Sequence, residues 1–181
     1  ASDDPPGVFA ARFLVTALLL GHDRERLHLL DGDYSAWTRE HPTETDAPAV
    51  EAVEYAVDPP AESPLVDASD VAAAVDGDAV VVDTRDSEEY AAGHVPGAVN
   101  VDWRSLVDDD SRGLLPREEL LALLAERGIT PDRRVVLYCN TARRISHTFW
   151  VLGHLGFEDV AFYEGSLTEW VEENRPLEGE H

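Results

Sequence analysis

From residue 65 onward, short continuous apolar runs alternate along the chain with segments of helical periodicity. The continuous runs predict buried strands, at residues 79–82, 98–101, 135–138 and 160–163. The segments around them predict helices, at residues 69–75, 86–92, 116–128, 145–155 and 166–173. Strands and helices in this order imply an α/β fold, a parallel sheet with helices on both faces.

The first third of the chain has a different pattern. Residues 8–21 predict a helix that is apolar nearly all round and is therefore buried against another part of the molecule. A short strand is predicted at residues 26–30 and a short helix at residues 33–40. Residues 43–64 are rich in Pro, Glu and Ala, which is typical of a linker.

The chain also contains an internal repeat, which we call the internal echo. Residues 19–37 and 152–170 each run through the end of a leucine-rich helix, a turn with Gly and His, a short apolar stretch, an acidic residue followed by Gly, and then a tryptophan. The spacing agrees to within a few residues. The first copy therefore resembles the closing part of a second domain of the same kind.

Composition narrows the range of partners. The net charge is −23, and all 14 basic residues are arginine. Such a surface repels nucleic acid and anionic membranes, so neither is expected as a partner. A lysine-free acidic protein resembles those of salt-loving archaea, which favours a haloarchaeal, halophilic origin. A single cysteine excludes an internal disulfide and fits a reducing cytoplasm, which we take as the expected location.

That cysteine has a distinctive position. Cys139 follows the predicted strand 135–138 and heads a loop, Cys139-Asn140-Thr141-Ala142-Arg143-Arg144, that leads into the next helix. In this order the loop amides can curl into a concave nest at a helix N-terminus, where partial positive charge gathers. A cysteine there, beside two arginines, is expected to present a thiolate at neutral pH. The pattern indicates a nucleophile.

Several motifs together resemble the rhodanese family, in particular the tandem-domain thiosulfate and 3-mercaptopyruvate sulfurtransferases. They are VDTR at residues 82–85, EYAAGHVPGA at 89–98, the six-residue loop after Tyr138, SHT at 146–148, and EGS followed by TEW at 164–170. The resemblance implies a catalytic rhodanese domain at residues 65–178, a linker at 43–64, and at 1–42 the remnant of an inactive rhodanese-like domain. It thus implies a rhodanese-like sheet preceded by a partial second domain.

The resemblance also implies an activity. The Cys139 thiolate would take the outer sulfur of thiosulfate as a persulfide and pass it to cyanide or a thiol. Small molecules are then the only partners required, without cofactor or metal, although the 1–42 segment could mediate self-association. The residues expected to bind substrate are Arg144, Arg143, Asn140, Thr141 and Ala142, with Arg144 favoured over Arg143. The residues expected to support the loop are Asp83, Arg85 and Ser146.

Two departures from the family pattern leave the sulfur donor open. Ala142 stands where glycine is common, so a left-handed backbone there would carry a modest strain. Two arginines in the loop favour thiosulfate, because loops of the mercaptopyruvate type tend to be small and uncharged. Some members, however, carry an arginine where this chain has Glu89, so 3-mercaptopyruvate remains an alternative.

Two other functional classes compete with the enzyme. Protein phosphatases on a related sheet need Cys-x5-Arg, and the residue at that position here is Ile145, which cannot clamp a phosphoryl group. A non-catalytic binding or regulatory rhodanese-like module is the second rival, but such modules generally lack the cysteine. The seven histidines show no ligand spacing, which argues against a metal site.

Overall fold

A computed structural model describes residues 7–58, 60 and 62–179. Its centre is a five-stranded, fully parallel sheet of order β1-β5-β4-β2-β3. The strands are β1 (Leu65–Val66), β2 (Val80–Asp83), β3 (Val99–Asn100), β4 (Val135–Tyr138) and β5 (Val160–Tyr163). The α/β prediction is confirmed. β1 was not predicted, because two residues are too few to show a pattern.

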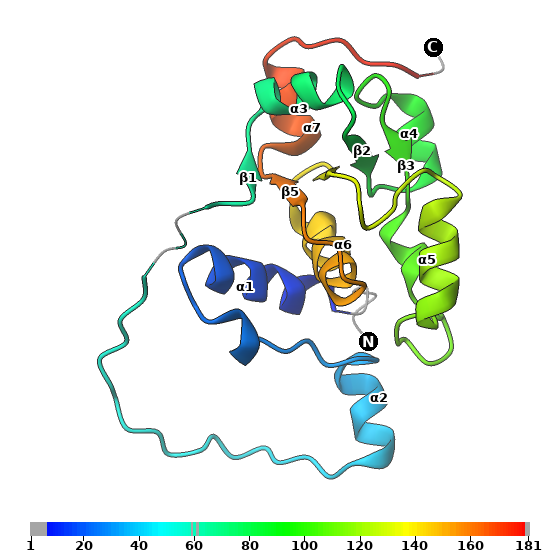
Figure 1. Cartoon of the computed structure of the whole chain (residues 1–181). Coiled ribbons are helices and arrows are strands. Elements are labelled where there is room, and N and C mark those ends of the chain that lie inside the picture. Colours follow the sequence, from blue (N-terminus) through cyan, green and yellow to red (C-terminus); the bar gives the residue numbers. More distant parts are fainter. Residues whose placement is uncertain (1–6, 59, 61, 180–181) are drawn as a thin grey trace.

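Helices join the strands and cover both faces of the sheet (Figure 1). They are α1 (Val8–Leu19), η1 (Arg24–Arg26), α2 (Asp33–Glu40), α3 (Ala68–Val75), α4 (Ser87–Ala92), η2 (Trp103–Leu106), α5 (Arg117–Ala125), α6 (Arg143–His154) and α7 (Ser166–Glu172). Helix α3 begins at Ala68, one residue before the predicted limit, because Asp67 caps it: its carboxylate accepts from the amides of Ser69 and Asp70 and forms a capping box.

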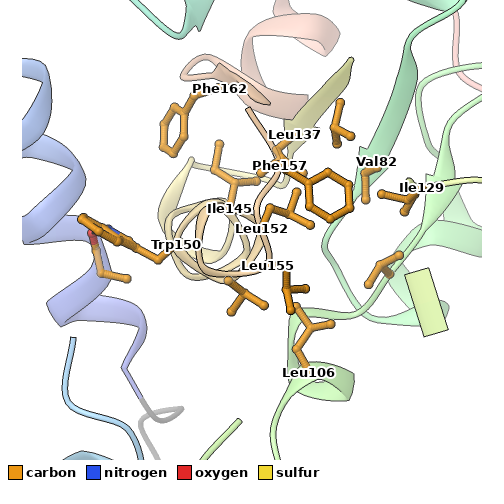
Figure 2. Close-up of a cluster of buried hydrophobic side chains, with 14 of the residues drawn as sticks. Val82, Leu106, Ile129, Leu137, Ile145, Trp150, Leu152, Leu155, Phe157 and Phe162 are labelled. Atoms are coloured by element: carbon orange, nitrogen blue, oxygen red, sulfur yellow. The ribbon is translucent and has the colours of Figure 1, made fainter. Parts of the chain in front are cut away.

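The core has two layers, one on each side of the sheet. The larger layer surrounds α6, whose Ile145, Leu152 and Leu155 meet side chains from β2, β4, β5 and the segment around Leu106 (Figure 2). Trp150 points from α6 toward α1, and its indole Nε1 donates to the Ala11 carbonyl at 3.3 Å. This contact between α1 and α6 fixes α1 on the part of the chain that contains the sheet.

Helix α1 packs against another part of the molecule, as predicted: Val8, Ala11, Leu14 and Val15 face α6, whereas Phe13 is 71% exposed. The strand predicted at residues 26–30 is wrong, because no strand among the described residues lies beside this segment. Helix α2 is confirmed, and residues 43–58 run as an irregular, exposed segment (Figure 1). Across the described residues, no helix has both the length and the apolar character needed to cross a bilayer.

Candidate active site

Cys139 lies at the carboxyl end of β4, in the middle of the sheet. The residue is only 1% exposed and belongs to the apolar layer around α6. It nevertheless lines a cavity of about 350 Å³, so the thiol lies at the inner wall of a hollow. The other residues that line this cavity are Val8, Phe9, Asn140, Thr141, Arg143 and Arg144.

The loop after Cys139 leaves a run of backbone amides unpaired. The amides of residues 140–145 donate no hydrogen bond to any residue that the structure describes. Ala142, which directly precedes α6, has φ 58° and ψ 6°, so the left-handed backbone considered for this position is present. Free N–H groups at the start of a twelve-residue helix favour a bound anion, through both hydrogen bonding and the helix dipole.

The loop between β5 and α7 forms hydrogen bonds to the backbone of the cysteine loop. The Ser166 hydroxyl accepts from the Cys139 amide at 3.3 Å and donates to the Tyr163 carbonyl at 2.9 Å. The Leu167 amide donates to the Cys139 carbonyl, and the Thr168 hydroxyl donates to the Asn140 carbonyl at 2.7 Å. Sequence reasoning assigned no role to these residues, although a serine directly after the Glu-Gly turn was a usable signal.

Asp83 and Arg85 form a buried pair at the end of β2. The Arg85 guanidinium donates to both carboxylate oxygens of Asp83 at 2.7–3.0 Å and to the Gly93 carbonyl at 2.7 Å. Its remaining nitrogen reaches the Asn140 side-chain oxygen at 3.4 Å. The pair therefore touches the cysteine loop, as expected of supporting residues. Ser146 supports the loop differently, since its hydroxyl donates to the Ala142 carbonyl at 3.0 Å.

Glu89 binds two side chains of the cysteine loop. Its carboxylate accepts from the Asn140 side-chain amide at 2.6 Å and forms an ion pair with Arg144. Burial opposes the ionisation of this carboxyl, but the hydrogen bonds from Arg144 and Asn140 outweigh it and lower the pKa of Glu89 to about 2. The charge of Arg144 is thus already matched by a carboxylate.

Arg143 is the more available of the two loop arginines. Its Nε donates to the Thr141 hydroxyl at 3.3 Å, and no carboxylate among the described residues lies within ion-pair distance of it. Both Arg143 and Thr141 are exposed and line the cavity. The sequence pattern favoured Arg144 as the anion-binding group, whereas the pairing in the structure favours Arg143.

Helix α1 contributes to this site from the N-terminal part of the chain, far in sequence from Cys139. Val8 and Phe9 line the cavity, and Arg12 donates to both oxygens of Glu164 at 2.8 and 2.6 Å. These hydrogen bonds raise the pKa of Arg12 above its usual value, and the neighbouring Cys139 adds to the effect. Arg12 is therefore a fixed positive charge near the cysteine. Sequence reasoning missed it, since its partner is 152 residues away.

His147 does not lie in the cysteine cavity. Its ring is buried against Trp103 with the ring centroids 5.5 Å apart, and burial lowers the pKa of His147 to about 4. A base role toward Cys139 therefore has no geometric support. Within the part of the chain that the structure describes, no three His, Cys, Asp or Glu side chains gather in a way that would hold a metal ion.

Comparison with known proteins identifies relatives. The family model described as a rhodanese-like domain matches residues 67–173. A putative thiosulfate sulfurtransferase of Haloferax volcanii is 33% identical over 83% of this chain and 57% of its own length. A thiosulfate sulfurtransferase of Azotobacter vinelandii is 34% identical over 93% of this chain and 64% of its own length. The chain thus spans about three fifths of these curated relatives.

Solved structures show the same fold. The anaerobic ergothioneine biosynthesis enzyme from Chlorobium limicola, in complex with trimethyl histidine, superposes with a TM-score of 0.83 at 21% identity. The similarity covers 96% of this chain and 46% of that one. The arrangement of the sheet, its helices and the N-terminal segment therefore occurs in longer chains as well.

Proposed function

This chain belongs to the rhodanese family, and from that premise we propose that it is a sulfurtransferase with Cys139 as nucleophile. The observation that carries the proposal is the position of Cys139, at the wall of a cavity and at the head of a loop whose amides are unpaired among the described residues. The sulfurtransferase relatives, which match most of this chain, support it.

The proposed reaction has two steps. The Cys139 thiolate attacks the outer sulfur of thiosulfate, the sulfur–sulfur bond of the donor breaks, and sulfite leaves with the electron pair. Cys139 then carries a persulfide, which cyanide or a thiolate attacks at the terminal sulfur to regenerate the thiolate. Both transfers move a neutral sulfur atom between anions, so neither needs an oxidant or reductant.

The chain's own residues have separable roles in this proposal. The amides of residues 140–145 stabilise the anionic sulfur on Cys139, and Arg143 binds the sulfonate end of the donor. Glu89 holds Arg144 and Asn140, and Ser166 holds the backbone of Cys139. The Arg85–Asp83 pair keeps the end of β2 against the loop.

The donor is proposed to be thiosulfate rather than 3-mercaptopyruvate. Arg143, which has no carboxylate partner among the described residues, offers its positive charge to the sulfonate end of thiosulfate. Arg144 and Arg12 are paired with Glu89 and Glu164, respectively, which weakens this preference. Initial rates with the two donors at equal concentration separate them, and we expect thiosulfate to be faster.

Intact mass spectrometry tests the class of reaction. Brief incubation with thiosulfate is expected to add the mass of one sulfur atom, and cyanide is expected to remove it and release thiocyanate. The Cys139→Ser variant is the matched control and is expected to gain nothing. A protein that keeps its mass after thiosulfate, while its circular dichroism shows an intact fold, would instead be a non-catalytic rhodanese-like module.

We also propose the division of the chain into three parts. Residues 65–178 form the catalytic domain and residues 43–64 the linker, while residues 1–42 are the closing part of an inactive rhodanese-like domain; residues 1–6 lie outside the described part. The repeated order of helix, turn, apolar stretch and helix supports this, with α1 and α2 in the places of α6 and α7. The lysine-free acidic composition supports adaptation to high salt.

A further inference from the structure

A second cavity, of about 310 Å³, lies between residues 24–33 and the side of α6. It shares no lining residue with the cavity at Cys139. Its size falls at the lower end of the range for sites that take small molecules, roughly 300–1,000 Å³. The function proposed above makes no use of it.

A buried polar group without a partner forms part of its wall. His147 is 3% exposed and lines the cavity, and its Nδ1 has no hydrogen-bond partner among the described residues. The unpaired Nδ1 itself has almost no accessible surface, so His147 contributes its ring to the wall of the cavity rather than an accessible hydrogen-bonding atom. Because burial holds the pKa of His147 near 4, the imidazole is neutral at pH 7 and adds no charge to this wall.

An uncompensated cation lies at the edge of the same cavity. The Arg24 guanidinium stacks on the Trp150 ring at 3.6 Å, and no carboxylate of the described chain lies within ion-pair distance of it. In a protein with 37 acidic residues, an arginine held in place and left without an acidic partner is positioned to bind an external anion.

The remaining wall limits what that anion can be. Apolar side chains make up much of it: Leu27, Leu29, Leu30, Val107, Leu114 and Val151. Two carboxylates are also present, Asp33, which is paired with Arg112, and Asp31, which accepts from the Leu114 amide. With Asp31 in the lining, a ligand of several negative charges is disfavoured.

We propose that this cavity binds a small organic monoanion with an apolar body. Its carboxylate or sulfonate pairs with Arg24, and its apolar part covers the leucine-rich wall and the neutral ring of His147. The site lies between α6 and the N-terminal segment, so its occupant also stabilises the docking of that segment on the catalytic domain.

The test uses the full chain and naphthalene-2-carboxylate as the probe, followed by two-dimensional ¹H–¹⁵N NMR. The reporter is the indole N–H of Trp150, assigned with a Trp150→Phe variant. We expect a saturable shift of this resonance, with a dissociation constant at or below about 1 mM. The uncharged 2-naphthamide has the same apolar body, and we expect it to bind about tenfold more weakly.

Arg24→Gln is expected to weaken binding of the carboxylate about tenfold, whereas Arg26→Gln, a neighbouring arginine outside the lining, leaves it unchanged. Circular dichroism and urea unfolding of each variant without probe report whether its fold is intact. Absence of a saturable shift overturns the proposal, as does an equal loss in both variants. Equal affinity of the unmodified protein for naphthalene-2-carboxylate and 2-naphthamide also overturns the proposal. This outcome does not depend on any variant.

Discussion

The two copies of the internal echo adopt the same local backbone. After α1 and after α6, a leucine is followed by a glycine in the left-handed region, Gly21 at φ 92° and Gly156 at φ 90°. The first residue of α2, Asp33, has φ 58°, and the first residue of α7, Ser166, has φ 52°. In each copy a tryptophan then donates to a nearby proline carbonyl, from Trp37 to Pro42 and from Trp170 to Pro176.

Their tertiary structures differ. In the second copy, β5 hydrogen-bonds to β1 on one side and β4 on the other, and Trp170 is 3% exposed. In the first copy, residues 27–30 have no strand beside them and Trp37 is 40% exposed. Similar sequences thus form similar caps and turns, but an apolar stretch becomes a strand only where neighbouring backbone completes its hydrogen bonds.

Truncation of the two tryptophans is expected to give the largest contrast between the copies. Trp170→Ala removes a buried side chain and is expected to cost about 3–5 kcal/mol of unfolding free energy. Trp37→Ala is expected to cost about 1 kcal/mol or less, because its side chain is largely exposed. Urea unfolding of both variants measures this, and equal losses would contradict the comparison.

A smaller effect is expected for the substitution of Ser166, the first residue of α7. Ser166→Ala leaves the buried Cys139 amide without its partner, and we expect a loss of about 1–3 kcal/mol. The rate of persulfide formation is expected to fall as well, since the loop backbone is no longer held. Ser105→Ala is the control, an exposed serine whose hydroxyl donates to the Asp102 carbonyl. A Ser166 variant with full stability and rate would show that this bond does not hold the loop.

The ion pairs of the two regions predict that the free energy of unfolding depends on pH. The folded-state pKa of Glu89 is about 2, below its ordinary 4.5, so its pair with Arg144 contributes stability above pH 4.5 that is lost as the pH falls toward 2. The contribution is expected to be below about 1 kcal/mol, because the pair is partly exposed. The difference in unfolding free energy between the natural chain and Glu89→Gln, followed over this range, measures it.

Asp33 gives the matched case in the first copy. Although burial acts against its ionisation, the hydrogen bonds from Arg112 and the Ser35 amide lower the pKa of Asp33, so Asp33→Asn is expected to show the same sign of pH dependence. A stability difference that grows as the pH falls, for either pair, would contradict the assignment.

The smallest effect on stability is expected on the outer face of α1. Phe13→Ser should change the unfolding free energy by no more than about 0.5 kcal/mol, because Phe13 is 71% exposed. Leu14→Ala, on the face toward α6, is the matched variant and is expected to destabilise clearly more. Sedimentation velocity of the Phe13 variant also tests self-association through this face, which it is expected to reduce.

Much of the sheet-containing part of the chain could be predicted from the sequence because its signals are local. The predicted runs at 79–82, 135–138 and 160–163 are apolar over their whole length, which indicates a sheet covered on both faces. The position of Cys139 at a strand end followed from strand and helix limits alone, whereas the left-handed backbone at Ala142 was expected from the family resemblance. These features depend on residues close together in the chain.

Only the tertiary structure decided which distant groups meet at the site. The contacts of Arg12 with Glu164, Glu89 with Arg144 and Ser166 with Cys139 each join separate elements, and no local pattern marks them. The sequence by itself determined the sheet, the turns and the place of Cys139 at a strand end, since backbone geometry and burial are set by neighbouring residues. The tertiary structure decided which arginine is free, which face of α1 is covered and which apolar stretch is a strand, since those depend on partners that packing alone supplies.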